Sequence, residues 1–157
     1  LHLSIRRQRQ MCIRDSLMKE KEIIHFACHG TYIESGLGSF ILLPNGEKLY
    51  AKDILSIRLN ANLVFLSACE SAKMSYTHGG DILGLLSSFI YAGAKSVIAS
   101  LWKINDYAAY IATIKFYENF LKGMDKAEAL RNSILQVMKE FQHPYYWAPL
   151  ILIGSWI

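Results

Sequence analysis

The stretch NLVFLSAC at residues 62–69 decides the fold, because it joins an unbroken apolar run to a cysteine. An apolar run of this length, without polar alternation, is typical of a strand that is buried on both faces of a parallel sheet. Two other runs have the same character: IIHFA at residues 23–27, just before His29, and SVIASL at residues 96–101. We therefore expect three central strands in one sheet.

Between and after these strands, turn signals alternate with stretches of helical spacing. This alternation predicts a three-layer α/β/α domain, in which helices cover both faces of a mainly parallel sheet. The other expected elements are a hairpin at residues 39–50, a short helix at 51–58, a loop at 71–80, a helix from Asp81 to Gly93, helices at 105–122 and 125–141, and a last strand at 150–153. The helix at 125–141 is expected to bury a face made of Ala127, Leu130, Ile134, Met138 and Phe141.

The composition fits one soluble globular domain. Of the 157 residues, 52% are hydrophobic and 19% are charged, which suffices for a core and argues against disorder. The apolar stretches are of strand length, well short of a membrane span, and the N-terminus lacks the apolar region of a signal peptide. Three cysteines without a C-x-x-C pair favour a reducing, cytoplasmic location and predict neither a disulfide framework nor a metal site. We expect no cofactor and no membrane partner.

Residues 1–16 differ in charge from the rest of the chain. They carry four arginines against one aspartate, whereas residues 17–157 are nearly neutral. A basic arm can bind nucleic acid or an acidic surface, but the globular part shows no such bias, so we expect no direct nucleic-acid partner. The wording RRQRQMCIRDS also resembles translated sequencing-adapter sequence. We therefore expect residues 1–16 to be a non-native or disordered arm and residues 17–157 to be the domain.

His29 and Cys69 follow two of the expected strands. Because functional groups of open α/β sheets collect beyond the carboxyl ends of the strands, these two side chains can lie side by side. An imidazole beside a thiol can remove the thiol proton and later protonate a leaving amine. Gly30 allows its backbone N–H to approach a substrate carbonyl, and with the N–H of Cys69 it can form an oxyanion hole. On spacing alone, a structural role for this Cys and His is the more common alternative.

Five segments, in order, carry a resemblance to the CHAT domain family, caspase-like domains that are related to separase and often follow helical repeats. The segments are IIHFACHG at 23–30, LVFLSACESA at 63–72, GDILGLLSSFIYAGAKSVIASLWKIND at 80–106, FYENFLKGMDKAEALRNSI at 116–134 and HPYYWAPLILIG at 143–154. The resemblance covers residues 22–157 and implies a caspase-like α/β/α fold. Complete members have further elements before the His strand, so we expect an unpaired sheet edge and a chain that is marginal or inactive alone.

The resemblance implies a cysteine endopeptidase in which His29 is the base and Cys69 the nucleophile. It also implies a mainly prokaryotic, cytoplasmic protein that cleaves a protein substrate. Activity would be regulated by a partner or by an N-terminal sensor such as a tetratricopeptide-like helical repeat.

Two residues are candidates for the substrate pocket. Asp106 of LWKIND stands where separase-like relatives carry an acid that reads the side chain before the scissile bond, which would favour Arg or Lys there. Lys103 stands where separases carry a further acid. Asp106 is also well placed as a helix N-cap, so both roles stay open. Ser67, two positions before Cys69, is expected to line the same pocket.

Other residues and functions have alternatives. Cys28 is expected in the core, His25 as a structural residue or a supporting group of the site, and His78 in a surface loop or on the substrate. A zinc site made of His25, Cys28, His29 and Cys69 is disfavoured, because the adjacent Cys28 and His29 diverge along a strand. The chain could also be a catalytically inactive caspase-fold interaction module, or a thiol hydrolase acting on a small amide or thioester.

Overall fold

The computed structural model describes residues 15–44, 46–68, 70–76 and 82–157. Its centre is a four-stranded sheet in the order β1 (Ile23–Ala27), β5 (Leu63–Ser67), β8 (Ser96–Ser100) and β9 (Leu150–Gly154). β1, β5 and β8 are parallel, and β9 runs antiparallel to β8. The mainly parallel sheet and its three expected strands are confirmed, but only β5 and β8 are central; β1 lies at the edge of the described sheet, with three of its five residues exposed. The direction of the last strand was not predicted.

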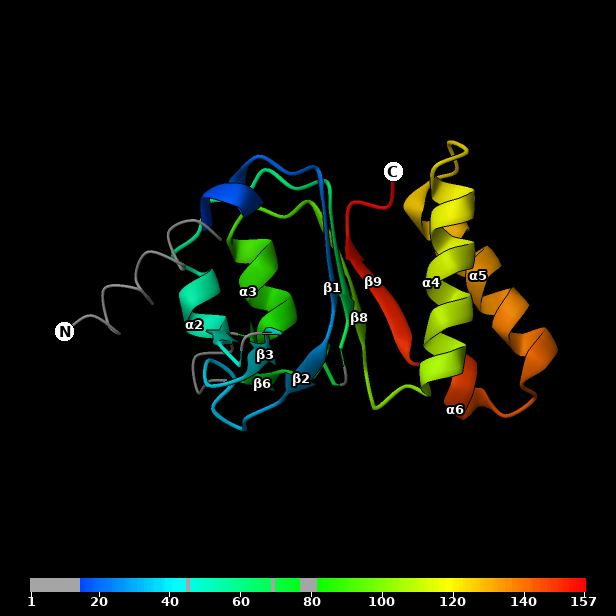
Figure 1. The fold of residues 1–157 in the computed structure, drawn as a ribbon, viewed down its shortest axis with the longest axis horizontal. Helices are drawn as coiled ribbons and strands as arrows, with labels where there is room; N and C mark the ends of the chain where they lie inside the picture. The colour runs from blue at the N-terminus through cyan, green and yellow to red at the C-terminus, as the bar shows by residue number, and fades with distance from the viewer. Residues whose placement is uncertain (1–14, 45, 69, 77–81) are drawn as a thin grey trace.

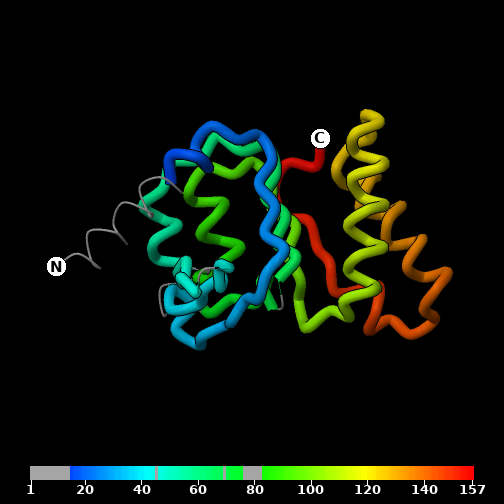
Figure 2. The backbone as a smooth tube through the Cα atoms, viewed as in Figure 1, coloured from blue at the N-terminus to red at the C-terminus, as the bar shows by residue number. Residues whose placement is uncertain are grey.

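Helices cover both faces of this sheet, as Figures 1 and 2 show. On one face lie α2 (Ala51–Ile54) and α3 (Leu85–Tyr91). A short helical segment at residues 15–19 precedes β1 in the chain. On the other face lie α4 (Asp106–Phe120) and α5 (Lys126–Glu140), followed by the short α6 (Pro144–Trp147). The expected α/β/α layering is therefore confirmed.

The strand β5 shows why an unbroken apolar run marks the middle of the sheet. Val64 and Leu66 pack into the cluster on the α3 side, whereas Leu63 and Phe65 pack into the cluster on the α4 side. All four side chains are fully buried. Because successive residues of a strand point to opposite faces, both faces need apolar residues when both are covered.

A second, antiparallel sheet leaves the end of β1. It consists of β2 (His29–Thr31), β3 (Phe40–Leu42) and β4 (Lys48–Tyr50) in that order. The pairing of β3 with β4 confirms the hairpin expected at residues 39–50. The sequence does not predict β2, which is held by β3 with His29 opposite Leu42.

The helix expected from Asp81 begins later, at Leu85. Ile82–Leu83 instead forms β7, which pairs with β6 (Ser75–Tyr76) inside the expected loop. Gly84 separates β7 from the helix, and a side chain there would meet the backbone oxygen of Lys73 at 2.7 Å. Gly93, at a φ of +112°, follows the helix as expected.

Two further helices differ from the expectation. The helix expected over residues 51–58 ends at Ile54. In α5 the buried face differs in part: Ala127 is exposed and Met138 is 40% exposed. The buried residues of α5 are Lys126, Ala129, Leu130, Ser133 and Val137. The expected face is therefore confirmed at Leu130, Ile134 and Phe141, which belong to or pack against the cluster on the α4 side, and wrong at Ala127 and Met138. The Lys126 side chain is buried as well, and it donates to Asn62.

Candidate functional site

A cavity of about 780 Å³ lies where β1 and β5 end, against α4. A cleft of this size is typical of small-molecule and peptide side-chain sites. It brings together four of the predicted site residues: His29, Gly30, Ser67 and Asp106. The other lining residues are His25, Ala27, Cys28, Glu70, Lys103, Ile104, Ala109, Tyr110, Thr113 and Ile114.

Cys69, the expected nucleophile and the second oxyanion-hole donor, lies outside the described residues, and so does His78. The residues around Cys69 are described. Ser67, at the end of β5, and Glu70 line the cavity, and Ala68 between them is only 2% exposed. The chain on either side of Cys69 thus borders the cavity that His29 also lines.

His29 is the first residue of β2, at the point where the chain passes from the central sheet to the second one. Its backbone is fixed from both directions, since β1 ends two residues before it and β3 pairs with it directly. The side chain is exposed. Within the described part of the chain, its imidazole has no hydrogen-bond partner, which leaves both ring nitrogens available to a ligand or to a neighbouring group.

The segment after Cys69 turns sharply and is tied to the sheet. Glu70 has a φ of +55°, in the left-handed region that residues other than glycine rarely occupy. The next residue, Ser71, is fully buried; its hydroxyl donates to Leu66 O at 3.3 Å and accepts from the N–H of Ser100 at 3.0 Å. Glu70 and Ser71 therefore fix the turn on this side of β5 through the backbone of one and the hydroxyl of the other.

The N-cap of α4 is Asn105. Its side-chain oxygen accepts from the N–H groups of Tyr107 and Ala108, at 3.1 Å and 3.2 Å. Asp106 is the first helical residue, is exposed and lines the cavity. The N-cap alternative for Asp106 is therefore wrong, because its neighbour already satisfies the free N–H groups at the start of the helix.

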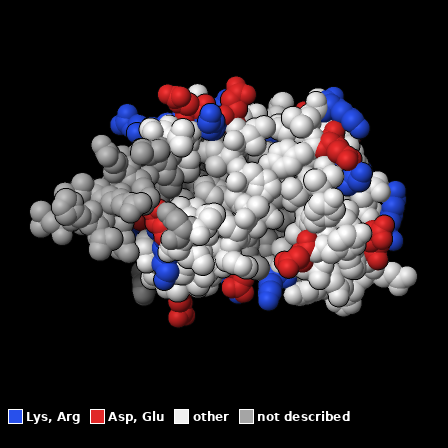
Figure 3. All heavy atoms as spheres, viewed as in Figure 1, with Lys and Arg blue, Asp and Glu red and all other residues white. Residues whose placement is uncertain are grey.

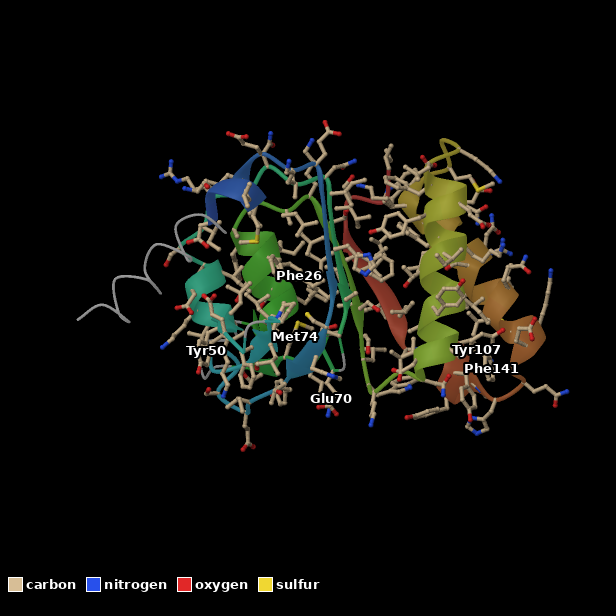
Figure 4. The ribbon with its side chains drawn as sticks, viewed as in Figure 1. Phe26, Tyr50, Glu70, Met74, Tyr107 and Phe141 are labelled. Atoms are coloured by element: carbon tan, nitrogen blue, oxygen red, sulfur yellow. The ribbon has the colours of Figure 1, made fainter. Side chains whose placement is uncertain are left out.

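The charged groups of the cavity gather at the end where α4 begins. Its described lining carries two carboxylates, Glu70 and Asp106, and one lysine, Lys103. Glu70 is engaged by Lys73, with 2.7 Å between Oε1 and Nζ, and Figure 4 places Glu70 at the end of the sheet where β2 begins. Asp106 has no ion-pair partner among the described residues. Its carboxylate is therefore the freer of the two to meet a cation.

His25 forms the opposite wall. Its Nδ1 lies 3.1 Å from the hydroxyl oxygen of Tyr117, and its ring stacks on Phe65 with centroids 4.8 Å apart. This partial burial of the ring lowers the pKa of His25 below its ordinary value of 6.5. The imidazole is accordingly neutral at neutral pH, although the residue as a whole stays exposed to the cavity.

Cys28 precedes His29 and is half-buried. It packs against the apolar cluster on the α3 side, as expected for a core residue, and it also lines the cavity. Burial raises the pKa of the Cys28 thiol above its ordinary value of 9.0. This disfavours the thiolate that a nucleophile needs.

The profile of the CHAT domain matches residues 6–155 of the chain. The chain belongs to the CHAT domain family. Two curated relatives are the tetratricopeptide repeat protein 28 of Mus musculus, 35% identical over 109 residues, and that of Homo sapiens, 34% identical over 109 residues. Each match covers 68% of this chain but only 4% of the relative, so the chain spans a small part of the length of these proteins.

Sequence reasoning missed part of the cavity wall of this CHAT domain. Tyr110, Thr113 and Ile114 follow Asp106 along one face of α4, at helical spacings of four, seven and eight. That spacing was available as a signal, because residues three to four apart share a helix face. In the described part of the chain, no three His, Cys, Asp or Glu side chains are grouped as a metal would need, and no helix is long and apolar enough to cross a membrane.

Proposed function

We propose that this CHAT domain is a cysteine endopeptidase that cleaves a protein substrate, with Cys69 as the nucleophile and His29 as the general base. The proposal rests on the observation that the neighbouring parallel strands β1 and β5 end at the same level of the sheet. Ala27 and Ser67 are register partners, and His29 and Cys69 each stand two positions beyond them. The cavity lined by His29, Ser67 and Glu70 offers room for a substrate at this edge.

In the proposed reaction, the Cys69 proton passes to His29 and the sulfur attacks the carbonyl carbon of the scissile peptide bond. The carbon–nitrogen bond then breaks, and His29 gives the proton to the leaving amine. The acyl group stays on Cys69 as a thioester. Water then attacks this thioester while His29 takes one of its protons, and the acid product and the Cys69 thiol are released.

The backbone N–H groups of Gly30 and Cys69 are proposed to stabilise the oxyanion that forms during both attacks. Gly30 lines the cavity directly beside His29, and it has no side chain that would hinder a substrate carbonyl. Asp106 is proposed to bind an Arg or Lys side chain before the scissile bond, which its free carboxylate at the cavity supports. Ser67 is proposed to line the same pocket, where it adds no charge.

We further propose regulation by a tetratricopeptide-like region or by a partner protein, in a cytoplasmic setting. The names of the two curated relatives, tetratricopeptide repeat protein 28, support such a neighbour. Both relatives come from mammals, so a prokaryotic origin stays a prediction.

A peptide electrophile with a C-terminal arginine tests the proposal. It should label wild type at Cys69, as read by mass spectrometry, and Cys69→Ala should abolish the label. Cys28→Ala is the matched control, since Cys28 lines the same cavity and should be dispensable. His29→Ala should slow labelling strongly. A label of unchanged yield in Cys69→Ala would refute the assignment.

The second candidate is a catalytically inactive interaction module. The names of the two relatives mention repeats and no peptidase activity. Tyr107 and Tyr110, 58% and 61% exposed on α4, offer aromatic surface of the kind that protein interfaces use. Partner capture that survives Cys69→Ala and His29→Ala together, with no cleavage product from wild type, would favour this function.

A further inference from the structure

The cavity is longer than one substrate side chain requires. Asp106 and Ile114 both line it, and they stand eight residues apart on α4. At about 1.5 Å per helical residue, the two positions are about 12 Å apart along the helix. An extended peptide advances about 3.3 Å per residue, so this wall can accompany about three to four substrate residues.

The end of the cavity away from Asp106 is uncharged. Its described walls are His25 and Ala27 of β1 and Ala109, Tyr110, Thr113 and Ile114 of α4. Figure 3 shows the same character at the surface: the middle of this face, over β1 and beside α4, is free of Lys, Arg, Asp and Glu. The carboxylates Glu70 and Asp106 belong to the other end, so the two ends of the cavity differ in chemistry.

His25 supplies a fixed ring at the uncharged end. Its contacts hold it from behind: the Phe65 ring is fully buried beneath it, and Tyr117 both stacks on it, with centroids 5.6 Å apart, and meets its Nδ1. A ring that is already immobilised loses little conformational freedom when a ligand packs on it. Across the cavity Tyr110 adds a second, 61% exposed aromatic side chain.

We infer that His25, Tyr110 and Ile114 form a second side-chain subsite, which takes an aromatic or large apolar side chain of the substrate peptide. This rests on the proposed function and deepens it: the substrate carries a basic residue that meets Asp106 and an apolar residue two positions away. In an extended chain, side chains two residues apart point to the same side and are about 6.6 Å from each other. Both therefore reach the same cavity from one peptide.

Two peptide substrates test the subsite. Both carry Arg before the scissile bond, and they differ only two residues upstream, where one has Phe and the other Asp. Wild type should favour the Phe peptide in kcat/KM by about tenfold or more, because an aromatic side chain is buried in one case only. Tyr110→Ala and His25→Asp should bring this ratio close to one. Tyr91→Ala is the matched control, because Tyr91 is equally exposed, at 66%, but lies on α3 and should leave the ratio unchanged.

Calorimetric binding of the same peptides to Cys69→Ser separates the subsite from the chemistry. Equal cleavage of both peptides by wild type, or an undiminished ratio in Tyr110→Ala, overturns the subsite and leaves the proposed peptidase intact. Tighter binding of the Phe peptide without cleavage by wild type refutes the peptidase and retains the subsite. Equal binding together with no cleavage overturns both.

Discussion

Ala27 of β1 and Ser67 of β5 are partners in the parallel register, and both line the cavity. This register makes the two strands end level with each other, about 4.8 Å apart, so the described residues that follow them, His29 on one side and Glu70 on the other, border the same cavity. A register slip of one residue would send one of the two partners to the opposite face of the sheet. This pairing is the structural basis for the site.

The size of the side chain at Ser67 should control access to the cavity. Ser67 is half-buried at the end of β5, so a leucine there adds volume towards the cavity more than into the packed layers. Ser67→Leu is expected to lower kcat/KM at least about tenfold, since even small misplacement of a substrate is costly. The melting temperature should stay close to wild type. Ser155→Leu, at an exposed position after β9, is the control, and a fully active Ser67→Leu would contradict this placement.

The backbone at Glu70 should distinguish substitutions by their tolerance of a positive φ. The φ of +55° suits Asn and Gly, whereas a β-branched residue is strained there. Glu70→Val is therefore expected to be about 1–2 kcal/mol less stable than Glu70→Asn in chemical denaturation. Both variants lose the exposed pair with Lys73, so that contribution cancels. Equal stability of the two variants would show that the turn after Cys69 does not need the left-handed conformation.

Asn105 and Asp106 should separate stability from specificity. Asn105→Ala removes the cap of α4 and is expected to cost about 1 kcal/mol in the free energy of unfolding, while Asn105→Ser should restore most of it. Asp106→Asn should leave the melting temperature nearly unchanged and lower cleavage of Arg-containing peptides at least about tenfold. The reverse pattern, with Asp106→Asn destabilised and fully selective, would return Asp106 to a structural role.

The sequence predicts those parts of the fold that depend on local patterns. The β5 run is apolar on both faces, and that alone indicates a central strand. The direction of β9 is not local, because Leu150–Gly154 is apolar whichever way it pairs with β8. The start of α3 is not encoded by a local pattern either. The residues of β7, expected in the helix, form a strand because they pair with Ser75–Tyr76.

The site residues divide in the same way, into those whose position a local pattern predicts and those whose position depends on how distant segments pack. The positions of His29, Gly30 and Ser67 could be predicted because parallel strands deliver their ends to one edge. Asp106 was placed by resemblance; the cap formed by its neighbour Asn105 excludes the N-cap role, and the substrate-pocket role stays a proposal. The wall formed by His25 and Tyr110 depends on how far α4 stands from the edge strand β1, which no local pattern encodes.

Lys126 should give the stability of the domain an alkaline pH dependence. This side chain is fully buried at the start of α5, where Nζ donates to the side-chain oxygen of Asn62 at 3.0 Å. Burial lowers the pKa of Lys126 below its ordinary 10.5, so the unfolded chain binds more protons than the folded one between the two values. The free energy of unfolding should therefore rise with pH in that window, relative to Lys126→Met. Urea denaturation of both proteins from neutral pH towards 10.5 measures this difference, and a constant difference would show that the charge is well solvated.

Cys28 should react slowly although it lines the same cavity as His29. Only the thiolate is nucleophilic, and burial raises the pKa of Cys28 above 9.0. In a Cys12→Ser, Cys69→Ser double variant, the rate of iodoacetamide alkylation should therefore rise with pH and reach half its maximum above 9.0. The same variant unfolded in urea should titrate near 9.0, which makes the unfolded chain the control. A midpoint below 9.0 in the folded protein would mean that the cavity activates Cys28, and that His29 serves its chain neighbour instead of Cys69.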